Sequence, residues 1–107
     1  MTTKEAIAAM IEGTMWELVD DEYASILRQV LIGEISPGHH FESLIPRTRF
    51  VAYDTRCDDR LMIVEGSDVA AYCVHLTFLG RSSHIDFPWV SPLKTLDDVR
   101  QLLLGDP

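Results

Sequence analysis

Cys73 and His75 come nearest, in type and spacing, to a catalytic pair. They are two positions apart in an apolar run, so in a strand both side chains leave the same face. A histidine can take the proton of a thiol and produce a thiolate nucleophile. No orienting acid is identifiable by spacing, however, and ordinary sheet packing is the favoured interpretation. A pocket lined by Cys73, His75, Phe87 and Trp89 remains the alternative site.

Other residues that could do chemistry lack the spacing that it requires. The histidines, at positions 39, 40, 75 and 84, form no H-x-x-x-H pair, and Cys57 and Cys73 form no C-x-x-C motif. We therefore predict no metal site, no catalytic residue and reduced thiols. The six glycines are scattered singly, without a phosphate-binding fingerprint, so no cofactor is predicted either.

The net charge of −8 is concentrated in the first third of the chain. Residues 1–36 hold seven acids against Lys4 and Arg28. Nucleic acids and anionic membranes are bound mainly through Lys and Arg, so this charge argues against both and favours a basic protein as partner. No signal-peptide pattern opens the sequence, and no run reaches the roughly 18 apolar residues of a membrane span. We expect a cytoplasmic protein.

Four carboxylates fall within six positions at the junction of the first two predicted helices. They belong to Glu17, Asp20, Asp21 and Glu22. Helix capping and a solvated surface would explain them, but they would also serve as a docking patch for Lys and Arg of a partner. Trp16 lies beside the apolar stripe of its helix, and an exposed tryptophan next to acids is a typical interface anchor. We predict these five residues as a candidate partner-binding patch, although core packing is the favoured interpretation for Trp16.

Helical patterns occupy the start of the chain. Thr2 and Glu5 form a capping box that opens a helix over residues 3–19. Its apolar residues recur at spacings of three and four, as on one helix face. Gly13 interrupts the pattern, so the segment is predicted as one helix or as two short ones.

Two further helices are predicted after this one. An apolar stripe over residues 20–33 predicts the second, ended by Gly33 in the left-handed conformation. Thr95 caps the last helix near the end of the chain. Between them, residues 80–94 read as an irregular connection that Trp89 pins onto the sheet.

From residue 47 onward, the apolar residues recur with the period of two that is typical of strands and no longer with the helical period. Three segments are rich in β-branched and aromatic residues: 49–54, 61–65 and 69–78. Their short connections predict an antiparallel meander. In the third segment Tyr72, Val74 and Leu76 alternate onto one face, which should meet the helices. The other face, with Cys73 and His75, is mixed and is expected to be only partly covered.

The last third of the chain resembles a group of small bacterial proteins of unassigned function. In that group a strand V-H-L-T-W-x-G leads to a Pro-Trp loop and a short final helix; here the strand lies in residues 72–80, with Phe78 in place of Trp, and is followed by Pro88-Trp89. In size, acidity and lack of a catalytic motif the chain is also similar to immunity proteins, which neutralise toxins delivered between competing bacteria. That likeness implies a toxin domain as partner and an inhibitory surface of acids and aromatic residues.

These observations together predict one α+β domain over residues 1–107. It comprises two amino-terminal helices, an antiparallel sheet of three to four strands and a carboxy-terminal helix, with the helices mainly on one sheet face. The first expectation for function is a non-catalytic protein-binding domain of the immunity type. The alternatives are a ligand-binding or enzymatic domain using Cys73 and His75, and a self-associating module whose second sheet face forms a homodimer.

Overall fold

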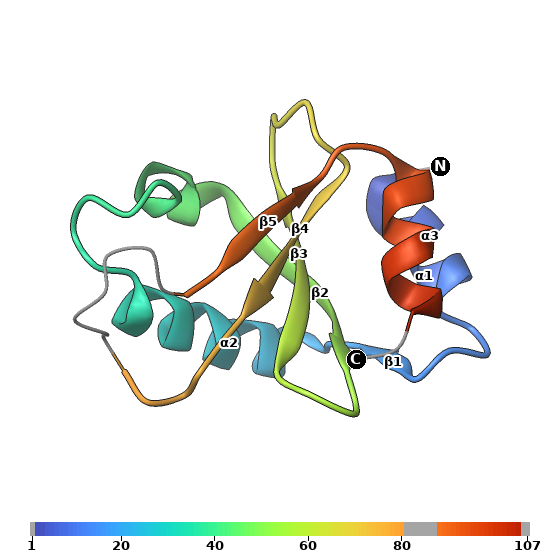
Figure 1. Ribbon diagram of the computed structural model, residues 1–107, viewed down its shortest axis with the longest axis horizontal. Helices are drawn as coiled ribbons and strands as arrows, with labels where there is room; N and C mark the ends of the chain where they lie inside the picture. The colour runs from blue at the N-terminus through green and yellow to red at the C-terminus, as the bar shows by residue number, and fades with distance from the viewer. Residues whose placement is uncertain (1, 81–87, 106–107) are drawn as a thin grey trace.

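One antiparallel sheet of five strands runs through the molecule, and its spatial order follows the chain (Figure 1). The computed structural model describes residues 2–80 and 88–105. The strands are β1 (Trp16–Leu18), β2 (Thr48–Asp54), β3 (Asp59–Val64), β4 (Ala71–His75) and β5 (Val90–Leu93). Each strand pairs antiparallel with the next. The α+β class and the antiparallel pairing are confirmed, but the sheet has five strands where three to four were predicted.

Three α-helices and one 3-10 helix accompany the sheet. They are α1 (Thr3–Met10), α2 (Asp21–Glu34), η1 (Glu42–Arg47) and α3 (Leu96–Leu104). The capping box of Thr2 and Glu5 is present, and Thr95 caps α3 in the same manner. Asp20 caps α2, since its side chain accepts a hydrogen bond of 2.7 Å from the Tyr23 amide. The starts of all three α-helices agree with the sequence pattern.

The segment from residue 11 to 19 is not helical, which corrects the predicted helix over 3–19. Gly13 adopts a positive φ of 78°, a conformation that ends the helix and that other residues rarely adopt. The Trp16 amide then donates to the Thr14 hydroxyl at 3.1 Å, which turns the chain. After this turn Trp16–Leu18 pairs with β2 as the edge strand β1.

Two predicted boundaries further along the chain are also wrong. Gly33 lies inside α2, whose last residue is Glu34; the backbone becomes extended at Ile35, two residues before Pro37. The connection over 80–94 is not irregular throughout, because Val90–Leu93 forms β5. Pro92 within it is tolerated because β5 is an edge strand.

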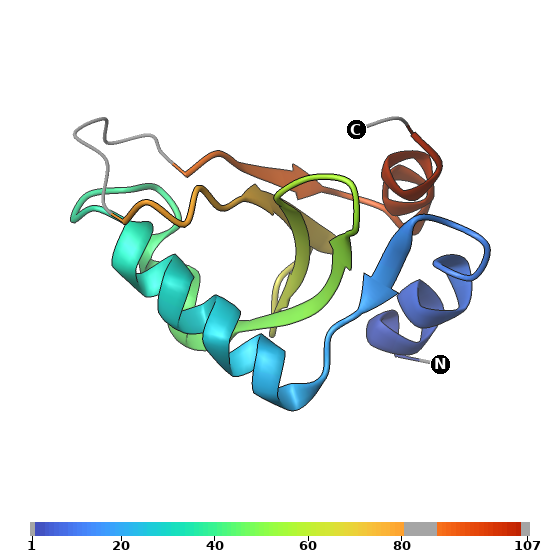
Figure 2. The same ribbon diagram turned by 90° about the horizontal axis from the view of Figure 1, so that it is seen from below.

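Helices cover both faces of the sheet rather than mainly one (Figure 2). On one face α2 packs over a core that includes Leu27, Leu31, Phe50, Met62, Val74 and Leu76. On the opposite face α1 and α3 pack over a second core, which includes Ile7, Trp16, Val51, Leu61, Ala71, Val99 and Leu103. A register shift in β2 between Phe50 and Ala52 turns two consecutive residues toward the second core. The sheet therefore separates two apolar cores.

The face beneath α1 and α3 is covered only in part. Leu61 and Ala71 are buried there, Cys73 is half-buried and His75 is exposed. Among the described residues, the surface of this face left for the predicted homodimer includes the His75 end of β4 and the neighbouring Ser91 of β5. Within residues 2–80 and 88–105, no helix combines the length and the apolar character needed to cross a membrane.

Candidate functional site

The four predicted carboxylates lie together on the surface, at β1 and the start of α2. Glu17, Asp20, Asp21 and Glu22 are all exposed. In the part of the chain that the structure describes, none of them forms an ion pair with a Lys or Arg side chain. No salt bridge therefore neutralises their charge, although Asp21 also borders a hollow lined by cationic side chains.

Trp16 does not belong to this surface. It is 3% exposed and packs in the core beneath α1 and α3, which corrects its predicted role as an interface anchor. Alternation along β1 sends Trp16 and Glu17 to opposite faces of the sheet. The adjacent residues therefore separate, one into the core and one onto the surface.

A row of side chains continues from Glu17 across three strands on the α2 face. Glu17 pairs with Tyr53 of β2, and Tyr53 pairs with Arg60 of β3. The Tyr53 hydroxyl donates to the Glu17 carboxylate at 2.7 Å, and this bond is the main reason why the pKa of Tyr53 is raised. The ring of Tyr23, from α2, meets the Tyr53 ring edge-on at 5.3 Å between centroids.

Arg60 is the buried centre of this row. It is 7% exposed, and its guanidinium lies 5.8 Å from the centroid of the Tyr53 ring and 5.3 Å from that of Phe78. Nη2 donates to the Tyr23 hydroxyl at 3.0 Å, whereas Nε has no acceptor in the described part of the chain. Aromatic faces and neutral oxygens therefore stabilise this cation in place of a carboxylate.

One flank of α2 borders the same row. At 100° per residue, Glu22, Tyr23 and Ile26 fall on the side of the helix that faces Tyr53. Ile26 is 51% exposed and Phe78 is 46% exposed. We call these six residues the acid-aromatic surface: Glu17, Glu22, Tyr23, Ile26, Tyr53 and Phe78. Sequence reasoning found its acids but missed its rings, which come from different elements.

Glu34 holds Phe78 at the rim of this surface. Its carboxylate is 2% exposed and accepts hydrogen bonds from the Thr77 amide at 2.9 Å, the Thr77 hydroxyl at 3.0 Å and the Phe78 amide at 2.7 Å. Phe78 adopts a positive φ of 60°, which a non-glycine residue keeps only when its surroundings enforce it. The Thr77-Phe78 part of the V-H-L-T-[WF]-x-G pattern is thus the segment that binds the buried Glu34.

The thiol of Cys73 is not activated as a nucleophile, although the neighbouring His75 has an acid partner. Nδ1 of His75 lies 3.0 Å from Oδ1 of Asp59, the type of contact that orients a catalytic histidine. Burial raises the pKa of the Cys73 thiol to about 12, which opposes thiolate formation. Trp89 is 57% exposed, and Phe87 lies outside the described residues.

Cys73 should resist alkylation in the folded protein. A thiol with a pKa near 12 is ionised in roughly one molecule in ten thousand at pH 8, compared with about a quarter for an ordinary cysteine. In a Cys57→Ser background, we expect iodoacetamide at pH 8 to modify native Cys73 at least about 100-fold more slowly than the urea-unfolded chain. Mass spectrometry against time gives both rates. Equal rates would show an accessible, ionised thiol and would revive the catalytic alternative.

His39 is another residue whose position the sequence did not indicate. It is 4% exposed; the Phe41 amide donates to its Nδ1 at 3.0 Å, so its Nε2 carries the proton and donates to the Pro88 carbonyl at 2.9 Å. His39 therefore connects the loop before η1 to Pro88, two residues before β5. Within residues 2–80 and 88–105, no group of three or more His, Cys, Asp or Glu side chains is arranged to hold a metal ion.

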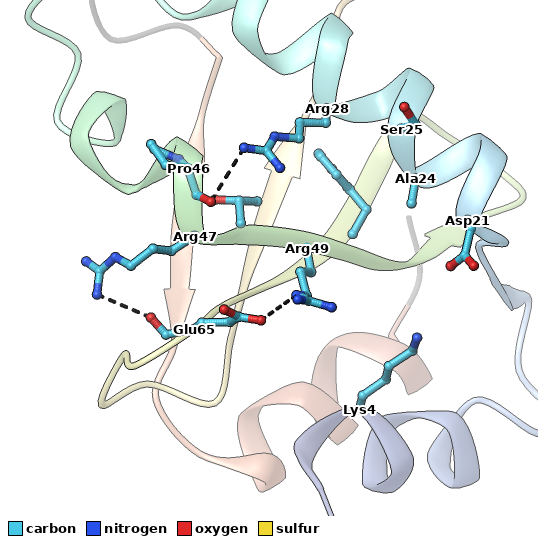
Figure 3. Close-up of a pocket in the computed structure, with 11 residues that line it drawn as sticks. Lys4, Asp21, Ala24, Ser25, Arg28, Pro46, Arg47, Arg49 and Glu65 are labelled. Atoms are coloured by element: carbon cyan, nitrogen blue, oxygen red, sulfur yellow. Dashed lines mark hydrogen bonds and ion pairs between the residues drawn. The ribbon is translucent and has the colours of Figure 1, made fainter.

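A hollow of about 320 Å³ lies on the opposite flank of α2, between that helix and β2 (Figure 3). Four cationic side chains line it, from four different elements: Lys4, Arg28, Arg47 and Arg49. Asp21 and Glu65 are the acids in its lining, and Glu65 forms an ion pair with Arg49. The two flanks of α2 therefore carry opposite charge.

Comparison of the chain with family models, with curated proteins and with solved structures finds no match.

Proposed function

We propose that the protein is a non-catalytic binding domain whose acid-aromatic surface docks a basic protein. The observation that carries the proposal is the junction of uncompensated carboxylates with partly exposed rings. Glu17 and Glu22 supply charge at one end of the surface, and Tyr53 and Phe78 supply aromatic area along it. Rings that are held rigidly and partly exposed are the usual anchors of interfaces, while surrounding charge speeds encounter and selects the partner.

The rigidity of this surface supports the proposal. Tyr53 is fixed by its bond to Glu17 and by its contact with Tyr23, and Phe78 is fixed through Glu34. Side chains that are already ordered lose little entropy when a partner covers them, so more of the contact energy appears as affinity. Arg60 beneath the rings keeps them in place and is itself hidden from a partner.

The proposed partner is a toxin domain rich in Lys and Arg, and the proposed setting is the cytoplasm of the cell that makes the protein. This inference follows the immunity-type combination of small size, acidity and an acid-aromatic surface. An inhibitor that blocks a basic active site by complementary charge needs no catalytic group of its own. The Cys73 thiol, whose pKa is raised by burial, is in keeping with such a role. The gene adjacent to the coding sequence is the first place to look for such a toxin.

The proposal can be tested with the protein encoded by that adjacent gene. We expect Glu17→Gln with Glu22→Gln to lower the association rate about five- to tenfold at low salt, and the difference from wild type to vanish at high salt. Stopped-flow or surface plasmon resonance measurements over a salt series give these rates. Glutamine has the same shape as glutamate, and the glutamine at position 17 can still accept the hydrogen bond from the Tyr53 hydroxyl.

A control with the same charge change distinguishes this surface from overall acidity. Asp68→Asn with Asp97→Asn also removes two exposed negative charges, from the β3-β4 turn and from α3. This control should change the association rate less than about twofold. If both pairs have equal effects, or if neither has any, the acid-aromatic surface is not the interface.

A further inference from the structure

We propose that the partner docked on the acid-aromatic surface inserts one apolar side chain into a second, smaller hollow beside Phe78. The segment that follows β4 runs beside the last turns of α2 (Figure 1), and a hollow of about 180 Å³ lies between them. Val30, Gly33 and Glu34 line it from the helix, and Phe78 and Gly80 line it from the segment. This inference rests on the function proposed above and adds which chemistry the partner presents: an apolar side chain at a defined distance from its basic residues.

Phe78 joins the hollow to the acid-aromatic surface. It lines the hollow, and the centroid of its ring lies 5.3 Å from the Arg60 guanidinium, which is 5.8 Å from the centroid of the Tyr53 ring. Leu79, next in the chain, is 89% exposed, and its amide donates to the Thr77 hydroxyl at 3.2 Å. Two neighbouring apolar side chains are thus held in solvent beside the hollow, as on a surface that a partner covers.

One flank of α2 leads from the acids to the hollow. At 100° per residue, four residues of the helix fall within an arc of about 80°: Glu22, Ile26, Val30 and Gly33. Glu22 and Gly33 are eleven positions apart, which corresponds to about 16 Å along the helix axis. An extended peptide advances about 3.3 Å per residue. The apolar residue of the partner should therefore lie about five positions from its basic residue.

The size and the lining of the hollow favour an apolar side chain. Small-molecule sites have volumes of roughly 300–1,000 Å³, so a hollow of about 180 Å³ is better suited to a single side chain. None of the described residues that line it is cationic, and the Glu34 carboxylate already accepts hydrogen bonds from Thr77 and Phe78. A charged group inserted here would lose hydration without gaining a partner, whereas an apolar group gains free energy from burial.

Gly33 keeps the hollow open on the side of the helix. A Cβ atom at this position would meet no atom within 4 Å beyond the helix backbone and the chain neighbours, so the space there is open. Glycine inside a helix is unfavourable compared with alanine. The stability of α2 alone would therefore favour alanine at this position, whereas access for a side chain of the partner favours glycine.

The test is an NMR titration of the full ¹⁵N-labelled chain with two synthetic peptides at constant ionic strength. One is acetyl-Leu-Ser-Gly-Ser-Gly-Lys-Lys-amide, and the other has serine in place of leucine; each is also used with its sequence reversed, because the two contacts do not fix the chain direction. Both peptides should shift the amides of residues 17–23 through their lysines. In one direction, the leucine peptide should also shift residues 30–34 and 78–80 and bind about fivefold more tightly than the serine peptide.

Three results would overturn the proposal, each in a recognisable way. If both peptides shift residues 17–23 but leucine adds neither affinity nor shifts at residues 30–34, the hollow is not a docking site and the acid-aromatic surface stands. If neither peptide shifts residues 17–23, the acid-aromatic surface fails and this inference fails with it. Shifts at residues 30–34 that grow with protein concentration in the absence of peptide would assign the hollow to a second copy of the chain.

Matched variants test the hollow itself. Gly33→Leu places a side chain of the protein in the hollow and should abolish the fivefold gain, while the affinity for the serine peptide changes less than about twofold. Gly33→Ala favours the helix, so it tests the site even if the larger side chain disturbs folding, and it should reduce the gain about twofold. Gln101→Leu adds a leucine to the exposed side of α3 and should change neither affinity. An undiminished gain in both Gly33 variants would overturn the proposal.

Discussion

Replacing Glu34 by alanine is expected to lower the free energy of unfolding by about 2–4 kcal/mol. The substitution removes the acceptor of three hydrogen bonds and leaves the amides of Thr77 and Phe78 without a partner at a partly buried site. It also releases Phe78 from the positive φ that this carboxylate enforces. Urea unfolding followed by circular dichroism measures the loss.

Two milder variants show whether the carboxylate itself is responsible. Thr77→Val removes one of the three donors and should cost only about 1 kcal/mol, and Gln29→Ala, exposed on the same helix, should cost about 0.5 kcal/mol or less. Glu34→Gln should recover part of the stability, because the amide oxygen can still accept both hydrogen bonds from Thr77, while its N–H group faces the Phe78 amide. An unfolding free energy of Glu34→Ala equal to that of wild type would contradict this account of the segment.

Replacing Trp16 by alanine is expected to cost about 3–5 kcal/mol of stability, since it opens a large cavity beneath α1 and α3. Trp16→Phe should cost less, about 1.5 kcal/mol or below, because the indole Nε1 is buried without an acceptor in the described residues and phenylalanine removes that group. Guanidinium unfolding provides both values. Partner affinity should be the same in Trp16→Phe as in wild type.

Trp89 provides the control for this pair. It is 57% exposed, so Trp89→Ala should change the unfolding free energy by about 1 kcal/mol or less. If Trp16→Phe weakened partner binding while its stability was unaffected, the tryptophan would belong to an interface after all.

Local rules of sequence explain the elements that were predicted well. The caps formed by Thr2, Asp20 and Thr95 act on amides within three residues, so their effect can be read without the fold. The same holds for α2, whose apolar stripe is continuous, and for the central strands, whose residues favour extended backbone. The alternation in β4 also placed Val74 and Leu76 correctly against α2.

Long-range contacts explain what the sequence could not predict. β1 is three residues long, and its pairing with β2 bridges more than 30 positions, so nothing local distinguishes it from helix. The burial of Glu34 is compensated by amides 43 and 44 positions away. Likewise, Tyr53 and Arg60 come together because β2 and β3 align in one register, and Phe78 lies beside Arg60 in a segment that Glu34 holds. The acids of the candidate site were found, and its rings were not.

The two outer strands of the sheet also restrict how a partner can bind. At β5, the carbonyls of Trp89 and Leu93 accept hydrogen bonds from the His75 and Ala70 amides of the neighbouring segment. Backbone groups alternate in direction along a strand, so those of Pro92 point away from the sheet. Proline has no N–H group that could bond to an added strand there. β1 presents only three residues at the other border. Neither border is a good template for strand addition, in recognition or in aggregation. Partners must therefore be distinguished by side chains, and variants of surface residues should change specificity without disturbing the backbone.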